Sequence, residues 1–204
     1  MLVPLRSLLI ASLTIAAAVA LSLPGSAAQT ERPCADCHKK VASGKVVHAA
    51  MGMGCDTCHA APHARKKPEL SLVKPVPELC FSCHDPSGFK KAVVHSPVAS
   101  GGCTSCHNPH ASENPTLLVQ PLPYLCEQCH QDKSDGKHVV AGGYGLGSKH
   151  PTRGKKDPSW KGRELSCRSC HEPHSSAWRA LAPGTAASGG LTCHTCHSRV
   201  TVRP

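Results

Sequence analysis

All 14 cysteines of this 204-residue chain lie in one repeated arrangement, Cys-x-x-Cys-His. Two thiols three positions apart can each form a thioether with one vinyl group of a haem, and the histidine that follows can bind the haem iron. No cysteine is left outside a motif, so the pattern predicts seven covalently bound haem c groups. The motifs are Cys34, Cys37 and His38; Cys55, Cys58 and His59; Cys80, Cys83 and His84; Cys103, Cys106 and His107; Cys126, Cys129 and His130; Cys167, Cys170 and His171; and Cys193, Cys196 and His197.

An iron held by a motif histidine has a second axial position, and eight histidines outside the motifs could fill it. Methionine is another axial ligand of c-type haems. Apart from two methionines within one turn of His48, at Met51 and Met53, the chain has only Met1, so at most one haem could use this ligand. The residues therefore favour two histidines on every iron. The candidate distal ligands are His48, His63, His95, His110, His138, His150 and His174, with His194 as the eighth histidine.

The motifs form an internal repeat, which bears on the fold before any single element does. The first cysteines at positions 34, 80 and 126 are spaced by 46 and 46 residues, and each is followed by a second motif in the same unit. We expect haem-pair units at about 33–65, 79–112 and 125–176, plus a single haem at 191–204.

Position within the repeat predicts which histidine serves which iron. His110 follows His107 by three residues and cannot reach round a porphyrin to the opposite face of the same iron, so it must bind a neighbouring haem. By this reasoning the histidines that closely follow a second motif serve the first haem of each pair; they are His63, His110 and His174. Those upstream of a second motif serve the second haem; they are His48, His95 and His150.

The seventh haem lacks a following motif from which to take a distal histidine. We expect His138 to serve it, because His138 lies in an extra segment that only the third unit has. His194 is the alternative, although it lies inside its own binding loop and would have to serve another iron or another subunit.

Zinc is the main rival for these cysteines, since Cys-x-x-Cys and histidine are zinc ligands as well. Structural zinc sites pair two half-sites and do not require histidine directly after the second cysteine. A disulfide scaffold would not need the histidine at all. Seven complete motifs therefore favour haem.

The N-terminus is typical of a secretory signal peptide. A short positive segment at 1–6 is followed by an apolar run of 16 residues at 8–23 and by small residues at 26–28. We expect cleavage after Ala28, a mature chain 29–204 without a membrane span, and a periplasmic, extracellular or outer-membrane-associated location.

Composition argues against a conventional core. The chain has two residues each of Trp, Tyr and Phe, with 18 Pro and 17 Gly, and shows no sustained helical or alternating period. We expect mostly coil with short α-helices, minimal β structure and a fold organised around a row of haems, because the porphyrins must supply most of the buried apolar surface.

The formal charge of +10 does not indicate nucleic-acid binding. Each haem brings two propionates, so seven haems would reverse the net charge. The basic residues are then better suited to pair with propionates than to bind phosphates.

Two stretches carry a family resemblance: VVHSPVASGGCTSCHNPHAS and GSKHPTRGKKDPSWKGRELSCRSCHEPHSS. They resemble the doubled-CXXCH-motif family of multihaem cytochromes c, and the resemblance covers roughly residues 33–197. It implies low-potential bis-histidine haems in a wire-like row and a role in bacterial respiratory electron transfer. It does not name the donor or the acceptor.

We therefore expect an electron-transfer protein rather than an enzyme, acting in extracytoplasmic respiration or extracellular electron transfer. Its partners would be redox proteins, whether as a diffusing shuttle, as part of an outer-membrane porin conduit or with copies of itself in a filament. The alternative is a nitrite-type multihaem reductase, which needs one open iron and a polar pocket around it. The motifs carry no altered histidine that would indicate such an iron.

Seven complete motifs predict the stoichiometry of the mature protein. Its intact mass should equal residues 29–204 plus seven haems, because each motif holds both thiols and the iron ligand. Mass spectrometry of the holoprotein checks this, and a mass short by one haem would show that one motif is unused.

Overall fold

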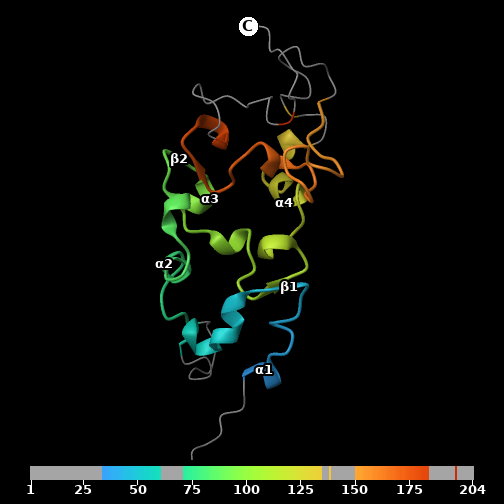
Figure 1. Ribbon diagram of the computed structural model, residues 1–204. Helices are drawn as coiled ribbons and strands as arrows, with labels where there is room; N and C mark the ends of the chain where they lie inside the picture. The colour runs from blue at the N-terminus through green and yellow to red at the C-terminus, as the bar shows by residue number, and fades with distance from the viewer. Residues whose placement is uncertain (1–33, 61–70, 135–137, 139–149, 184–195, 197–204) are drawn as a thin grey trace, which may run out of the picture. The chain divides into compact units, whose positions relative to one another are not determined.

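The computed structural model describes residues 34–60, 71–134, 138, 150–183 and 196 (Figure 1). The signal peptide predicted at 1–28 lies outside these residues and stays a prediction. Within the described part, short helical turns alternate with coil, and no helix is longer than five residues. The prediction of mostly coil with short helices and minimal β structure is confirmed.

Each described haem-binding motif is built on one helical turn. The first motifs of the units begin in α1 (Cys34–Cys37), α2 (Glu78–Phe81) and α4 (Tyr124–Glu127), and the second motifs begin in the 3-10 turns η2 (Cys55–Thr57), η4 (Cys103–Ser105) and η7 (Cys167–Ser169). In all six, the histidine N–H donates to the carbonyl oxygen of the first cysteine at 2.9–3.0 Å. Residues at i, i+3 and i+4 of such a turn share one face, so both thiols and the imidazole can meet one porphyrin.

The remaining helical turns lie between the motifs. Proline begins several of them, as expected where an N–H has no helical partner. They are α3 (Ser96–Ala99), η1 (Ala49–Met53), η3 (Pro86–Phe89), η5 (Pro115–Leu117), η6 (Gln131–Lys133) and η8 (Arg179–Leu181).

Two short antiparallel ladders connect successive units of the repeat. β1 (Val46–Val47) pairs with β3 (Ala111–Ser112), with Val46 opposite Ser112, and β2 (Val93–Val94) pairs with β4 (Ser175–Ser176), with Val93 opposite Ser176. In both ladders the strand before an upstream histidine meets the strand that follows the second motif of the next unit. The register extends to the histidines themselves, because the His48 N–H donates to the His110 carbonyl at 2.8 Å and the His95 N–H to the His174 carbonyl at 3.0 Å.

The described residues contain almost no apolar core. Ala111 and Ala182 are the buried apolar residues among them, at 5% and 7% exposure, while Val47, Val73 and Val119 are exposed. A chain of this length normally buries a large apolar surface on folding. The polypeptide part described here therefore cannot be held together by packing of its own side chains.

A close approach at the β1 and β3 ladder yields a stability prediction. A Cβ added at Gly44 would lie 2.9 Å from the backbone N and O of Ser112. Because backbone cannot move aside as a side chain can, we expect Gly44→Ala to destabilise the holoprotein by about 1–3 kcal/mol. A thermal melt followed in the haem absorption measures this.

Gly52→Ala is the matched control, since its added Cβ would have nothing within 4 Å. Equal melting temperatures for the two variants would contradict a tight approach at Gly44.

Candidate functional site

Ten described histidines form five ring pairs, each joining one motif histidine to one histidine from outside the motifs. The ring centroids lie 5.8–6.1 Å apart in all five pairs. The pairs are His59 with His110, His84 with His48, His107 with His174, His130 with His95, and His171 with His138.

This separation fits a metal ion held between two imidazoles. A metal–imidazole bond of about 2.0 Å and about 1.1 Å from the ring nitrogen to the ring centre put two axial rings about 6.2 Å apart. The interplanar angles of 14–59° are compatible with this, since each ring can turn about its own metal–nitrogen bond. The residues therefore fit the iron of a haem in five places within the described chain.

Backbone carbonyls orient one ring in four of these pairs. The Nδ1 atoms of His48 and His95 lie 2.8 Å and 3.0 Å from the carbonyl oxygens of Pro109 and Pro173. Those of His107 and His171 lie 2.9 Å and 2.7 Å from the carbonyl oxygens of Thr116 and Ala180. A carbonyl can only accept, so Nδ1 carries the proton and Nε2 keeps its lone pair for a metal.

The carbonyls of Thr116 and Ala180 come from unusual backbone turns. Thr116 and Leu117 have φ values of 56° and 60°, and Ala180 and Leu181 both have 53°. Residues other than glycine rarely adopt this left-handed region, and β-branched ones least of all. The same turn occurs nine residues after His107 and nine residues after His171. In both places its carbonyl orients the imidazole, so the unusual backbone conformation serves to position these two rings.

Three of the histidines outside the motifs sit in surroundings that keep them neutral. Burial lowers the pKa of His110, and the nearby His59 and His48 lower it further. Burial likewise lowers the pKa of His174, with His107 adding to the effect. Burial and then His171 lower the pKa of His138. A neutral imidazole is the form that binds a metal.

Histidine rings from different units face each other, which differs from the pairing predicted within each unit; which iron each ring binds stays a prediction. His110 faces His59 of the preceding unit rather than His84, and His174 faces His107 rather than His130. Correspondingly, the rings of His48 and His95 face His84 and His130 of the following unit. The two β ladders cause this pairing, because they bring the upstream histidine of one unit beside the string C-H-x-P-H of the next.

The pairing in the third unit also differs from the predicted one. The ring of His138 faces His171, the motif histidine for which His150 was predicted. His63, Cys193, His194 and His197 lie outside the described residues, so the distal ligands of the first and seventh haems stay predictions.

Thiols from consecutive motifs also meet. A side-chain hydrogen bond with Cys34, together with burial, raises the pKa of Cys55, while burial and then the neighbouring Cys103 raise that of Cys80. A side-chain hydrogen bond with Cys126 lowers the pKa of Cys167 to about 7. All 13 cysteines in the described part are free of disulfides, as haem attachment requires.

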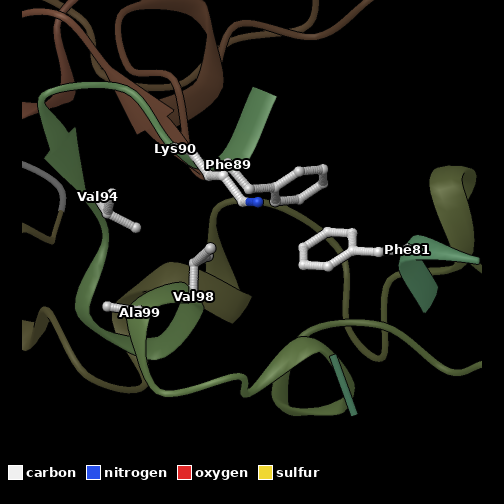
Figure 2. A pocket seen from close by; sticks show the side chains of 6 residues that line it. All are labelled: Phe81, Phe89, Lys90, Val94, Val98 and Ala99. Atoms are coloured by element: carbon white, nitrogen blue, oxygen red, sulfur yellow. The ribbon is translucent and has the colours of Figure 1, made fainter. Parts of the chain in front are cut away.

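A largely apolar pocket of about 370 Å³ is lined by side chains that include two phenylalanines (Figure 2). The phenyl rings of Phe81 and Phe89 lie next to each other, 5.3 Å apart, and residues of β2 and α3 with Lys90 complete the lining. Phe89 also contacts the ring of His174 at 4.6 Å. Large apolar walls beside a candidate axial histidine, with one ammonium group at hand for a carboxylate, suit a porphyrin with its propionates.

Sequence reasoning missed the carbonyls that orient the imidazoles. For His48 and His95 the acceptor is the proline of the string C-H-x-P-H in the next unit, and that proline repeats in the sequence at a fixed register. This repetition could have indicated its role. The residue types at Thr116 and Ala180 do not predict a left-handed turn.

The arrangement is that of a protein with several covalently attached c-type haems, and comparison with known proteins agrees. A family model described as the doubled CXXCH motif matches residues 48–89, 95–135 and 161–201, together more than half of the chain. The chain belongs to this family. No curated protein and no solved structure matches.

Membership makes the chain a multihaem c-type cytochrome that binds haem c covalently outside the cytoplasm. Among the helices in the described part, none has the length and apolar character that crossing a bilayer requires.

Proposed function

We propose that the chain is a seven-haem c-type cytochrome that passes electrons along a row of low-potential bis-histidine haems in extracytoplasmic respiration or extracellular electron transfer. The observation that carries this proposal is the set of five histidine pairs at the spacing of two axial ligands. Haem iron, when bound, takes up and releases one electron by changing between its ferric and ferrous states.

Contacts between neighbouring motifs support a continuous row. Within a unit, thiols of the two motifs touch, as at Cys34 and Cys55 or Cys126 and Cys167. Between units, the backbone bond from His48 to His110 joins two ring pairs, and the bond from His95 to His174 joins two more. These two kinds of contact alternate from the first to the sixth motif, so no described motif is separated from the next.

The ligand environment supports a low potential. Two imidazoles favour the ferric state more than a histidine and a methionine do. An Nδ1–H that donates to a carbonyl makes the imidazole a stronger ligand, and His48, His95, His107 and His171 all make this bond. These four rings are therefore strong donors to an iron, which favours its ferric state and a low potential.

The same register extends along the sequence to the ends of the chain. The upstream histidines of the first two units face the first motif of the next unit, so His150 becomes the proposed distal ligand of the seventh motif. His63 is then left for the first. The proposal includes export by the signal peptide at 1–28. It also includes redox-protein partners, with the chain acting as a diffusing shuttle, as part of a porin conduit or as a protomer of a filament.

Full bis-histidine ligation predicts the spectra. The oxidised and reduced holoprotein should be low-spin throughout, without a methionine–iron charge-transfer band, and carbon monoxide and nitrite should not bind. Electronic absorption and magnetic circular dichroism measure this. A high-spin fraction that binds either ligand stoichiometrically would favour the nitrite-type reductase instead.

The exchange of ligands between units predicts a dependence between variants. His48→Ala should make one haem high-spin, because its partner His84 would be left alone on the iron. In a chain that also lacks the third haem, through Cys80→Ser and Cys83→Ser, the same substitution should add no high-spin signal.

The matched control lacks the second haem, through Cys55→Ser and Cys58→Ser. There, His48→Ala should still produce a high-spin haem. If His48→Ala instead produces a high-spin haem in the chain without the third haem, and none in the chain without the second, then His48 binds the same iron as His59.

A further inference from the structure

The third unit carries a hairpin that the other units lack. Seven positions separate His48 from Cys55 and eight separate His95 from Cys103, but seventeen separate His150 from Cys167. The additional residues fold back on themselves at 153–165, a segment named here the third-unit hairpin. Its ends are joined by a reciprocal pair of backbone bonds between Gly154 and Leu165, at 3.1 Å and 2.9 Å.

A buried carboxylate fixes the hairpin to the sixth haem-binding motif. Asp157 is buried, its Oδ1 accepts from the backbone and hydroxyl of Ser159, and its Oδ2 accepts from the Ser169 hydroxyl at 2.6 Å. Burial alone would raise the pKa of Asp157, but the bonds from Ser159 and Ser169 outweigh it and hold the pKa below its usual value. The carboxylate is therefore ionised and fully bonded.

A second anchor fixes the hairpin to the fifth motif. The guanidinium of Arg153 donates to the Glu127 carboxylate at 2.8 Å and lies over the Tyr124 ring at 5.9 Å. Both partners belong to α4, and the Arg153 and Glu127 side chains are only 32% and 21% exposed. The hairpin thus spans the junction where Cys126 and Cys167 meet.

Neither anchor uses the face of its turn that carries the two thiols and the imidazole. Cys167, Cys170 and His171 share one face of their turn, so Ser169 points to the opposite side. Glu127 directly follows the first cysteine of the fifth motif, about 100° round the turn from it, and so lies on the flank of that turn. A hairpin held at these two residues leaves that face of both turns open to a haem.

The tip of the hairpin combines positive charge with an aromatic ring. Lys155, Lys156 and Lys161 are exposed, and Trp160 is 56% exposed. The Arg163 guanidinium lies over the indole at 3.8 Å, so one face of the ring already carries a cation.

We propose that the tip of the third-unit hairpin is the docking surface for an acidic redox protein that exchanges electrons with the fifth and sixth haems. The inference rests on the proposed electron-transfer function. One electron leaves the reduced partner, one haem iron goes from ferric to ferrous, and no proton or group is transferred. The lysines steer an acidic surface toward the tip, while Trp160 and Arg163 supply the residue types that dominate protein interfaces.

Charge and geometry favour a protein over an anionic membrane. Insertion into a bilayer requires an uncovered apolar side chain, but the guanidinium of Arg163 covers one face of Trp160. A protein interface accommodates a paired tryptophan and arginine at its centre with lysines at the rim.

The test measures electron transfer from a photoreduced acidic flavodoxin, used as the probe, to the oxidised holoprotein. Changing Lys155, Lys156 and Lys161 to Glu should lower the second-order rate constant at least tenfold at about 10 mM salt, and the difference should vanish near 1 M salt, where charges are screened. The control changes Lys39, Lys40 and Lys91, which are also exposed, to Glu and alters the net charge equally. Equal losses in both variants would overturn the proposal.

Two more variants test the tip itself. Asp157→Ala removes a negative charge, and by charge alone the reaction with flavodoxin would become faster. The same substitution loosens the hairpin, so the proposal predicts a slower reaction. An unchanged or faster rate would contradict the proposal. Trp160→Ala should slow the flavodoxin reaction severalfold and leave the haem spectrum unchanged. A changed spectrum or reduction potential would place Trp160 against a porphyrin and overturn the docking role.

Two further measurements separate the remaining outcomes. Photoreduced lumiflavin, an uncharged reductant, should react at the same rate with all variants. If the wild-type protein does not accept electrons from lumiflavin, the proposed electron-transfer function is contradicted. A slower rate that occurs with flavodoxin alone supports docking at the tip. Binding to phosphatidylglycerol vesicles that is lost in the lysine variant, with an unchanged flavodoxin rate, would assign the tip to a membrane surface instead.

Discussion

The backbone hydrogen bond from an upstream histidine of one unit to the second-motif string of the next is the interaction on which the rest of the structure depends. It is 2.8 Å from His48 to His110 and 3.0 Å from His95 to His174, and each bond continues a ladder of only two residues per strand. A two-stranded ladder of this length would be only marginally stable in isolation. Its effect is to fix two imidazoles side by side, each of which faces a motif histidine elsewhere in the chain.

Those ladders cannot hold the fold together without help, because the described residues bury so little apolar surface. Val47, next to His48, is exposed, and so are Val73 and Val119, which hold equivalent places after two second motifs. Apolar side chains exposed at repeated positions suit contact with porphyrins, which supply apolar surface in a multihaem cytochrome. Folding and haem attachment are therefore coupled, as in small metal-binding domains that have no fold without their metal.

Sequence reasoning predicted the chemistry of the site better than its connections. The motif spacing alone puts Cys34, Cys37 and His38 on one face of a turn, and the structure forms that turn in every described motif. The composition predicted the coil-rich fold. His110 and His138 face other motif histidines than predicted. For His110 the reason is strand pairing between units, and two-residue strands such as Val46–Val47 leave no periodic pattern in a sequence. The left-handed turn at Thr116 was hidden for a similar reason, since no glycine marks it.

The two kinds of junction differ in what keeps them in place, and this difference explains why the chain can tolerate an insertion in one of them. Junctions between units depend on backbone pairing, so their segments keep nearly constant length; the steps from Val46 to His48 and from Val93 to His95 are identical. Among the described residues, no strand pairing links the two motifs of the third unit, whose cysteines Cys126 and Cys167 lie close together, and the chain between them can lengthen. Loop-closure entropy rises only slowly with length, so the third unit can carry an extra hairpin at small cost. The hairpin is then held in place by Asp157, which accepts from Ser169 of the sixth motif, and by Arg153, which donates to Glu127 of the fifth.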